Sequence, residues 1–225
     1  NRTMMDEIID GINEINTNDQ IRVAMILGEG RAFMAGADIK EYANQTPEEF
    51  VSFQEKGCNL YESIENAPIP WIAAINGYAL GGGFEIALSC DMILASTKAK
   101  MGLPEVFLSL VPGGGGTQRL IQRIGINRAK EVLYTGAQFS AETFHLWGIV
   151  NHVYQEGTFK EEAINFAKKL SRRPPKAINQ LKRLANMSLL HLPFEQKIEE
   201  EGKAVTHLFF SKEAQEAIQK FMEKN

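Results

Sequence analysis

The sequence predicts an α/β fold whose C-terminal part is entirely helical. Short apolar runs bounded by glycine or proline alternate with longer amphipathic segments over residues 1–157, which is typical of a β/α arrangement. Over residues 158–225 the pattern is helical throughout. The 225 residues, 44% of them hydrophobic, suffice for a continuous core. We therefore expect a β/α domain over residues 1–157 and a helical region over residues 158–225.

Four apolar and partly β-branched runs predict buried strands. They occupy residues 21–27, 71–75, 92–95 and 149–154. The first run leads into the turn Gly28-Glu29-Gly30, and Pro68 and Pro70 precede the second. Strands and helices therefore alternate along the first part of the chain.

Helices are predicted where apolar residues recur at a spacing of three and four. The first covers residues 4–15. A second covers residues 46–66, where Thr46-Pro47-Glu48-Glu49 offers a capping box with proline at the first helical position. Three further positions are expected to bound helices: Gly125 as a stop, Ser140 as an N-cap, and Thr158 as the start of a second capping box with Glu161.

Charge and cysteine content exclude several classes of protein. The formal net charge is −4, so no general positive field is present to attract nucleic acid or an anionic membrane. Cys58 and Cys90 are too few for a disulfide scaffold and indicate a reducing compartment. No apolar stretch approaches the roughly 18 residues that cross a bilayer. We expect a cytoplasmic protein, with the mitochondrial matrix as the open alternative, and neither nucleic acid nor membrane as a partner.

Familiar cofactor and metal motifs are absent from the sequence. The chain has no G-x-S-x-G turn, and neither glycine cluster is followed by the Lys-Ser/Thr of a phosphate-binding loop. The first cluster does not complete G-x-G-x-x-G, and the four histidines include no pair spaced by four residues. We therefore expect no metal site and no cofactor.

Two glycine clusters lie close in sequence to acids. Gly81-Gly82-Gly83 precedes Glu85 at the start of a predicted helix, where missing side chains let a ligand approach backbone N–H groups. A second acid, Glu105, ends the run GLPE, where a further strand is expected, and precedes the glycines of residues 113–116. The sequence therefore predicts that two carboxyl groups converge. Small residues at positions 35–39, followed by a lysine, offer a third place for close approach by a ligand.

In combination these segments resemble the enoyl-CoA hydratase/isomerase, or crotonase, superfamily, and the resemblance extends over essentially the whole chain. It rests on residues 31–41, 72–85, 102–105 and 112–119, which are RAFMAGADIKE, IAAINGYALGGGFE, GLPE and PGGGGTQR. The resemblance implies a crotonase-like β/α spiral core and a C-terminal helical region that builds a homotrimer or a hexamer, as a dimer of trimers. Relatives usually carry two strands before the position of Asn1, so we expect those upstream strands to be missing here.

The resemblance also implies roles for single residues. The backbone N–H groups of Ala37 and Gly82 form the oxyanion hole that binds the thioester carbonyl of an acyl-CoA, and Gly113 lies near the attacking water. Glu85 orients and activates that water, while Glu105 exchanges the proton at the α carbon. Coenzyme A, as part of the substrate, is expected near six positions: Ala35, Asp38, Ile39, Lys40 and, from a neighbouring subunit, Phe221 and Lys224. For Asp38 a helix cap is favoured over a ligand contact.

The chemistry is consistent with these assignments. Addition of water β to a thioester develops enolate charge on the carbonyl oxygen, and losing one N–H donor there typically lowers the rate by about 10²–10³. Two carboxyl groups around one water cannot both ionise easily in a dry pocket, so Glu85 and Glu105 are expected to titrate as a coupled pair. We therefore predict syn hydration of short and medium 2-enoyl-CoA thioesters, in fatty-acid β-oxidation or a related acyl-CoA pathway.

Two alternatives stay open. A Δ3,Δ2-enoyl-CoA isomerase on the same scaffold needs only one of the acids, and a non-catalytic homologue that binds acyl-CoA or RNA needs neither. The presence of both acids favours hydration, and the acidic balance disfavours RNA. Elsewhere, Arg119 and Arg123 are expected to be ion-paired or solvated at the surface, and Trp71 and Trp147 to lie in the core.

Overall fold

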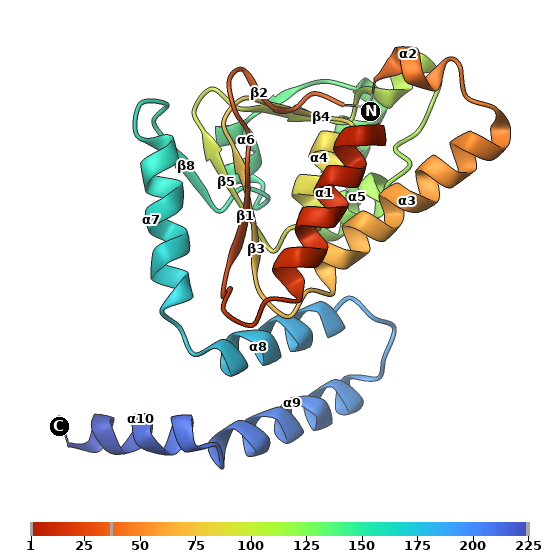
Figure 1. Ribbon diagram of the computed structural model, residues 1–225. Coiled ribbons are helices and arrows are strands. Elements are labelled where there is room, and N and C mark those ends of the chain that lie inside the picture. Colours follow the sequence, from red (N-terminus) through yellow and green to blue (C-terminus); the bar gives the residue numbers. More distant parts are fainter. Residues whose placement is uncertain (1, 37, 224–225) are drawn as a thin grey trace. The chain divides into compact units, whose positions relative to one another are not determined.

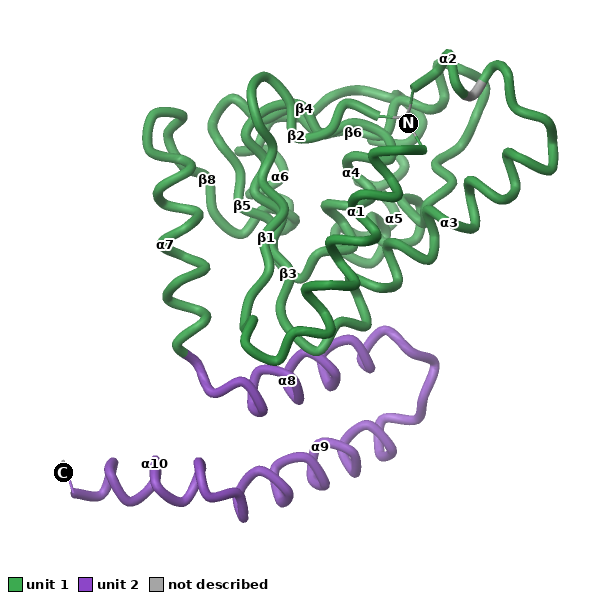
Figure 2. Tube along the Cα trace, viewed as in Figure 1, with its two compact units in different colours: residues 1–172 green, residues 173–225 purple. Residues whose placement is uncertain are grey.

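The computed structural model describes residues 2–36 and 38–223 and divides the chain into two compact units, Asn1–Arg172 and Arg173–Asn225 (Figure 2). The first unit contains α1 (Arg2–Asn16), β1 (Ala24–Leu27), β2 (Ala32–Met34), α2 (Ile39–Tyr42), α3 (Pro47–Glu65), β3 (Trp71–Ile75), β4 (Tyr78–Leu80), α4 (Gly82–Ser89), β5 (Met92–Ser96), β6 (Lys100–Gly102), the short 3₁₀ helix η1 (Pro104–Leu108), α5 (Gly116–Thr135), β7 (Phe139–Ser140), α6 (Ala141–Leu146), β8 (His152–Tyr154) and α7 (Phe159–Ser171). The second unit contains α8 (Pro175–Met187), α9 (Phe194–Phe209) and α10 (Lys212–Met222).

Two four-stranded sheets form the centre of the first unit (Figure 1). One sheet has the strand order β1-β3-β5-β8 and is parallel throughout. The other has the order β2-β4-β6-β7, in which only the β6–β7 pair is antiparallel. Each successive pair of strands adds one strand to each sheet, first β1 and β2, then β3 and β4, then β5 and β6. The predicted β/α spiral core is therefore confirmed.

Strand β3 shows why the parallel sheet reads as a continuous apolar run in the sequence. All five of its residues are buried. Trp71, Ala73 and Ile75 belong to the main core, which also contains apolar side chains of α3 and α4. Ile72 and Ala74 face the other way and pack with α7. Because helices cover both faces, neither face of the strand carries the polar residues that would produce an alternating pattern.

The strongest local signals in the sequence are confirmed. Helix α3 begins after Thr46, whose Oγ1 accepts from the Glu49 N–H at 3.2 Å while a Glu49 carboxylate oxygen accepts from the Thr46 N–H at 2.9 Å. Ser140 caps α6 by accepting from the Thr143 N–H. The Trp71 side chain is buried, and Trp147 packs against the core beside Phe139 and Phe144.

Helix α7 begins after Thr158 as expected, but the predicted capping box is absent there, and the expected helix stop at Gly125 is wrong. Thr158 has φ −116° and ψ −6° rather than the extended conformation of an N-cap, and its hydroxyl donates to the Gln155 carbonyl instead of capping α7. Gly125, with φ +75° and ψ 162°, kinks the chain, but the helix resumes on its far side and α5 continues to Thr135. The boundary between the units also differs from the expected residue 157: it follows α7, because that helix packs on the parallel sheet.

Of the four short strands in the second sheet, β6 matches the strand expected before Glu105, and β2, β4 and β7 have no counterpart in the predicted elements. Strands β2, β4, β6 and β7 contain two or three residues each, which is too short for an alternating pattern to develop. The expected strand at residues 149–154 is shorter than predicted and forms β8. Over the described residues, no helix combines the length and the apolar character needed to cross a bilayer.

Candidate active site

The first glycine cluster shapes the turn that leads from β4 into α4. Gly81, the N-cap of α4, has φ +53°, a conformation that residues with a side chain rarely adopt. Its N–H donates to the Gly102 carbonyl at 3.0 Å, which ties the start of α4 to the end of β6. A Cβ on Gly83 would overlap the Met34 backbone. Gly82 is the first residue of α4, so its N–H has no partner within the helix.

The second glycine cluster holds the carboxyl group of Glu85. This side chain is only 4% exposed, and its Oε1 accepts from the N–H groups of Gly114 and Gly116, each at 2.8 Å. A Cβ on Gly114 would lie 2.8 Å from Glu85 Oε2, and one on Gly116 would lie 2.9 Å from Oε1. Glycine at both positions is therefore needed for the backbone to approach the carboxylate this closely.

Burial dominates the pKa of Glu85. Removal from water raises the pKa above its ordinary value, and the two N–H bonds and the positive charge of Arg119 only partly offset this. The ionised form of Glu85 is therefore stabilised by two backbone N–H donors and by Arg119 rather than by solvent.

Glu105 lies in the first turn of η1, directly after Pro104. Burial, together with the charge of Glu85, raises its pKa to about 7. Its Oε2 is buried and accepts no hydrogen bond from any described residue. The other oxygen, Oε1, lies beside Gly81, where a Cβ would be only 2.9 Å away. The Glu105 carboxyl group is therefore largely protonated below pH 7.

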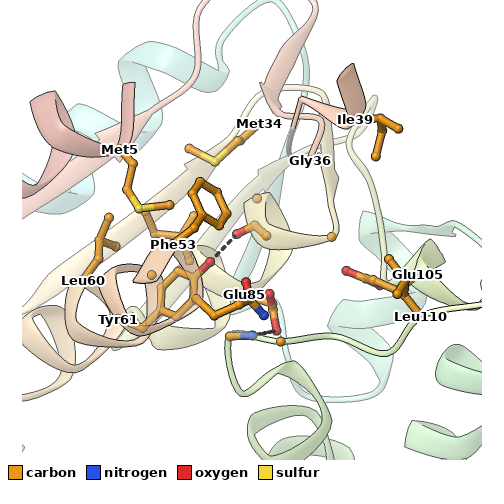
Figure 3. A pocket seen from close by; sticks show the side chains of 18 of the residues that line it. Met5, Met34, Gly36, Ile39, Phe53, Leu60, Tyr61, Glu85, Glu105 and Leu110 are labelled. Carbon is orange, nitrogen blue, oxygen red and sulfur yellow. Dashed lines mark hydrogen bonds between the residues drawn. The ribbon is translucent and has the colours of Figure 1, made fainter. Parts of the chain in front are cut away.

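Both acids line one cavity of about 700 Å³ (Figure 3). Its wall also includes Gly82 and Gly113, and side chains from α1, α2 and α3. The structure thus brings together two acids that are twenty positions apart in sequence, together with both glycine clusters. This arrangement can hold a water molecule or a polar reacting group beside two carboxyl groups whose environments differ. The catalytic roles of the two acids stay predictions.

A network behind the cavity fixes the Gly114 turn. Arg119 donates from Nε to Glu65 Oε1 at 2.6 Å and from Nη2 to Glu65 Oε2 at 2.8 Å, and its Nη1 donates to the Gly114 carbonyl. The guanidinium also lies over the Tyr61 ring, 5.6 Å from its centroid. The Tyr61 hydroxyl donates to the Gly82 carbonyl at 3.5 Å (Figure 3). Helix α3 is thereby linked to both glycine clusters.

Glu65 and Tyr61 are not among the residues expected from the sequence, because no local signal marks them and their partners lie far along the chain. The ion pair expected of Arg119 is confirmed, although the side chain is only 14% exposed. Arg123 is also part-buried rather than on the surface, and its Nη2 donates to the carbonyls of Leu88 and Cys90 at the end of α4.

The positions expected near coenzyme A fall into three groups. Ala35 and Ile39 line the cavity. Asp38 caps α2 by accepting from the Lys40 N–H at 3.0 Å, so the favoured cap is confirmed, and the Lys40 side chain is exposed. Ala37 and Lys224 lie outside the described residues. Phe221 belongs to the second unit, so its expected contact with coenzyme A stays a prediction.

Metal-ligating side chains are dispersed. Among residues 2–36 and 38–223, no group of three or more histidines, cysteines or acids is placed to hold a metal ion.

The chain is similar to known proteins over its full length. The family model described as "Enoyl-CoA hydratase/isomerase" matches residues 1–225. A probable enoyl-CoA hydratase from Bacillus subtilis is 36% identical, with 98% of this chain and 86% of the relative aligned. The 2,3-dehydroadipyl-CoA hydratase of Escherichia coli is 31% identical, over 100% and 87%. The crystal structure of an enoyl-CoA hydratase from Bacillus anthracis superimposes with a TM-score of 0.94 at 35% identity, over 100% and 87%. The chain therefore belongs to the enoyl-CoA hydratase/isomerase family, and it is an enzyme of the enoyl-CoA hydratase type.

Proposed function

We propose that the enzyme catalyses the reversible syn addition of water to 2-enoyl-CoA thioesters. One observation carries the proposal: a buried carboxyl group, that of Glu85, and a part-buried one, that of Glu105, line the same cavity in different environments. Glu85 is held by two backbone N–H donors, which favour its ionised form. Glu105 has a pKa of about 7 and a buried oxygen that accepts no hydrogen bond from the described residues. One group therefore suits a base and the other an acid at neutral pH.

The proposed step moves one water molecule and two protons. The water oxygen bonds to the β carbon while the Glu85 carboxylate takes a proton from that water. The α carbon takes a proton from Glu105, so the double bond becomes a single bond. A proton transfer from Glu85 to Glu105 then restores the starting state. Because the charge of Glu85 raises the pKa of Glu105, we expect the two carboxyl groups to titrate as a coupled pair.

The transient negative charge lies on the thioester oxygen, and backbone donors stabilise it. The Gly82 N–H, at the first position of α4 on the cavity wall, supports this role. The resemblance to the family assigns the second donor to Ala37. Gly113, also on the wall, suits a position near the water. Ala35, Asp38, Ile39 and Lys40 are proposed to lie along the coenzyme A moiety.

Assembly and pathway are part of the same proposal. Large apolar side chains are exposed in and beside the last two helices, which supports a homotrimer or a hexamer: Phe194, Phe210, Phe221 and Met222. We propose a cytoplasmic enzyme that acts in fatty-acid β-oxidation or a related acyl-CoA pathway. The names of the Bacillus subtilis and Escherichia coli relatives support hydration as the reaction.

The proposal is tested by giving the purified protein crotonyl-CoA and a 3-enoyl-CoA in parallel. Hydration of the first is followed through the ultraviolet absorbance of the conjugated thioester, and products are identified by mass. We expect the mass of water to be added to crotonyl-CoA. Migration of the double bond without hydration would instead establish the isomerase, and tight binding without turnover would establish a binding protein.

A further inference from the structure

The cavity continues beyond the acids into an apolar wall. Helices α1 and α3 supply six side chains to it: Met4, Met5, Ile8, Phe50, Phe53 and Leu60. In Figure 3, Met5, Phe53 and Leu60 lie together on one side of Glu85, and Glu105 and Leu110 lie on the other. An acyl chain whose reacting carbons sit beside the acids can extend along this wall.

Charge in the cavity has only one sign. Of the described residues that line it, Glu85 and Glu105 alone are ionisable acids or bases of the Asp, Glu, Lys, Arg and His types. The neutral polar side chains are Gln54 and Tyr61, and the Tyr61 hydroxyl already donates to the Gly82 carbonyl. An additional negative charge would therefore meet two acids and no described cation.

Three cations on the elements around the cavity bond to groups outside it. The Nε of Arg2, in α1, lies 3.6 Å from Oε1 of Glu41, and Lys56 of α3 forms an ion pair with Asp6. Arg119 approaches the cavity from behind, but its nitrogens bond to Glu65 and to the Gly114 carbonyl. None of these three side chains lines the cavity.

We infer that this cavity selects 2-enoyl thioesters with a neutral, apolar acyl tail and rejects those whose tail ends in a carboxylate. The inference rests on the proposed function and specifies its substrate class. A tail carboxylate would lose its hydration against Met and Phe side chains without gaining a partner. It would also be repelled by the carboxylate form of Glu85. The fold does not impose this choice, since the Escherichia coli relative is named for a substrate of the dicarboxylic kind.

The apolar wall differs from a rigid pocket in one respect. Met4 and Met5 belong to the wall and Met34 lines the cavity from β2, and the unbranched methionine side chain adapts its shape to irregular neighbours. Apolar tails of different shape are therefore accommodated more easily than a tail of suitable shape that carries charge.

The experiment compares kcat/KM for four substrates of the purified enzyme. They are crotonyl-CoA, 2-hexenoyl-CoA, 2,3-dehydroadipyl-CoA, which has the same six acyl carbons but ends in a carboxylate, and the ω-methyl ester of the last. We expect the carboxylate to lower kcat/KM by at least about 100-fold relative to 2-hexenoyl-CoA, as for an unpaired buried charge. The larger but neutral ester should stay within about 10-fold.

Each outcome decides between the inference and the proposed function. Similar values for 2-hexenoyl-CoA and 2,3-dehydroadipyl-CoA would overturn the inference and leave the hydratase proposal intact. Equal rejection of the ester and the acid would overturn it too, since size rather than charge would then explain the loss. Failure with 2-hexenoyl-CoA alone would show that the wall does not receive the tail. If even crotonyl-CoA is not hydrated, the proposed function fails. The inference is then tested by comparing the dissociation constants of 2-hexenoyl-CoA and 2,3-dehydroadipyl-CoA.

Two variants at Met4 test whether the lack of a cation in the cavity lining causes the selection against a tail carboxylate. Met4 is 45% exposed at the edge of the wall, so a lysine there can keep its charge partly hydrated. Met4→Lys should improve the ratio of kcat/KM for 2,3-dehydroadipyl-CoA to that for 2-hexenoyl-CoA by about 10-fold. Met4→Gln, which is similar in length but neutral, should not. Equal ratios in the two variants would contradict the electrostatic basis of the selection.

Discussion

Arg119 binds Glu65 through two parallel hydrogen bonds, of 2.6 and 2.8 Å, although the residues lie 54 positions apart in the sequence. The same guanidinium donates to the Gly114 carbonyl, and the Gly114 N–H in turn donates to Glu85. A single arginine therefore connects α3 to the turn that holds the proposed base. Such a bidentate, largely buried arrangement fixes orientation as well as supplying energy.

Replacing this arginine should affect turnover more than substrate binding. Arg119→Met leaves the Gly114 turn without its anchor, so we expect kcat for crotonyl-CoA to fall about 10- to 100-fold with KM changed less than threefold. Because Arg119 also lowers the pKa of Glu85, the pH dependence of kcat/KM should move upward on its acid side. Steady-state kinetics between pH 5 and pH 9, on the order of one point per half unit, measures both effects.

The matched control is Arg123→Met. Arg123 is also a part-buried arginine on α5, but it donates to carbonyls of Leu88 and Cys90 and not to the Gly114 turn. Both variants should lose about 1–3 kcal/mol in the free energy of unfolding, measured in urea. Only Arg119→Met should change the pH profile. If the pH dependence of kcat/KM moved equally in both variants, Arg119 would contribute only to the stability of the fold and not to the properties of Glu85.

Substitution of either acid by its amide should remove most of the hydration activity. Glu85→Gln and Glu105→Gln keep the shape of each side chain but take away the group that exchanges a proton. Each variant should hydrate crotonyl-CoA at least about 100-fold more slowly, while circular dichroism shows a folded protein. Near-normal turnover by either folded variant would rule out the two-acid mechanism.

A methyl group at Gly114 should disrupt the site directly. The added Cβ would overlap the Tyr61 ring and lie 2.8 Å from Glu85 Oε2. Gly114→Ala should therefore lower kcat/KM for crotonyl-CoA by at least about 100-fold, since small displacements of catalytic groups have large effects on rate. Gly11→Ala is the control, because nothing lies within 4 Å of its added Cβ. In α1 that change should leave activity unaltered and stabilise the fold by about 0.5–1 kcal/mol.

The raised pKa of Glu105 predicts a pH dependence of stability. The carboxyl group titrates at an ordinary value of 4.5 in the unfolded chain and at about 7 when folded. Its contribution to stability is therefore fully present below pH 4.5 and is lost as the pH rises through 7. The free energy of unfolding of Glu105→Gln, relative to that of the wild type, should therefore be about 1–3 kcal/mol higher at pH 8 than at pH 4. This range allows for partial screening of the carboxylate by solvent. Urea unfolding at the two pH values measures this difference, and a constant difference would contradict the raised pKa.

Much of the fold could be predicted from the sequence because its signals are local. The capping box at Thr46 and the apolar run at residues 71–75 each act within a few residues, and both are confirmed. The failures have equally local causes. Thr158 has the residue types of a capping box but not the extended backbone, and Gly125 kinks a helix without ending it. The short strand β2 has too few residues to show a pattern of its own, and it pairs with β4 in the structure.

By itself, the sequence determined the alternation of strands and helices, the two glycine clusters and the two acids that follow or precede them. Only the tertiary structure decided that Glu85 receives its N–H donors from the second cluster, and that Glu65 and Arg119 hold that cluster in place. It also decided which side chains of α1 and α3 share a cavity with the acids. The physical reason is that desolvation and charge depend on what surrounds a group in space. Residues far apart in the chain supply those surroundings, and no spacing in the sequence records them.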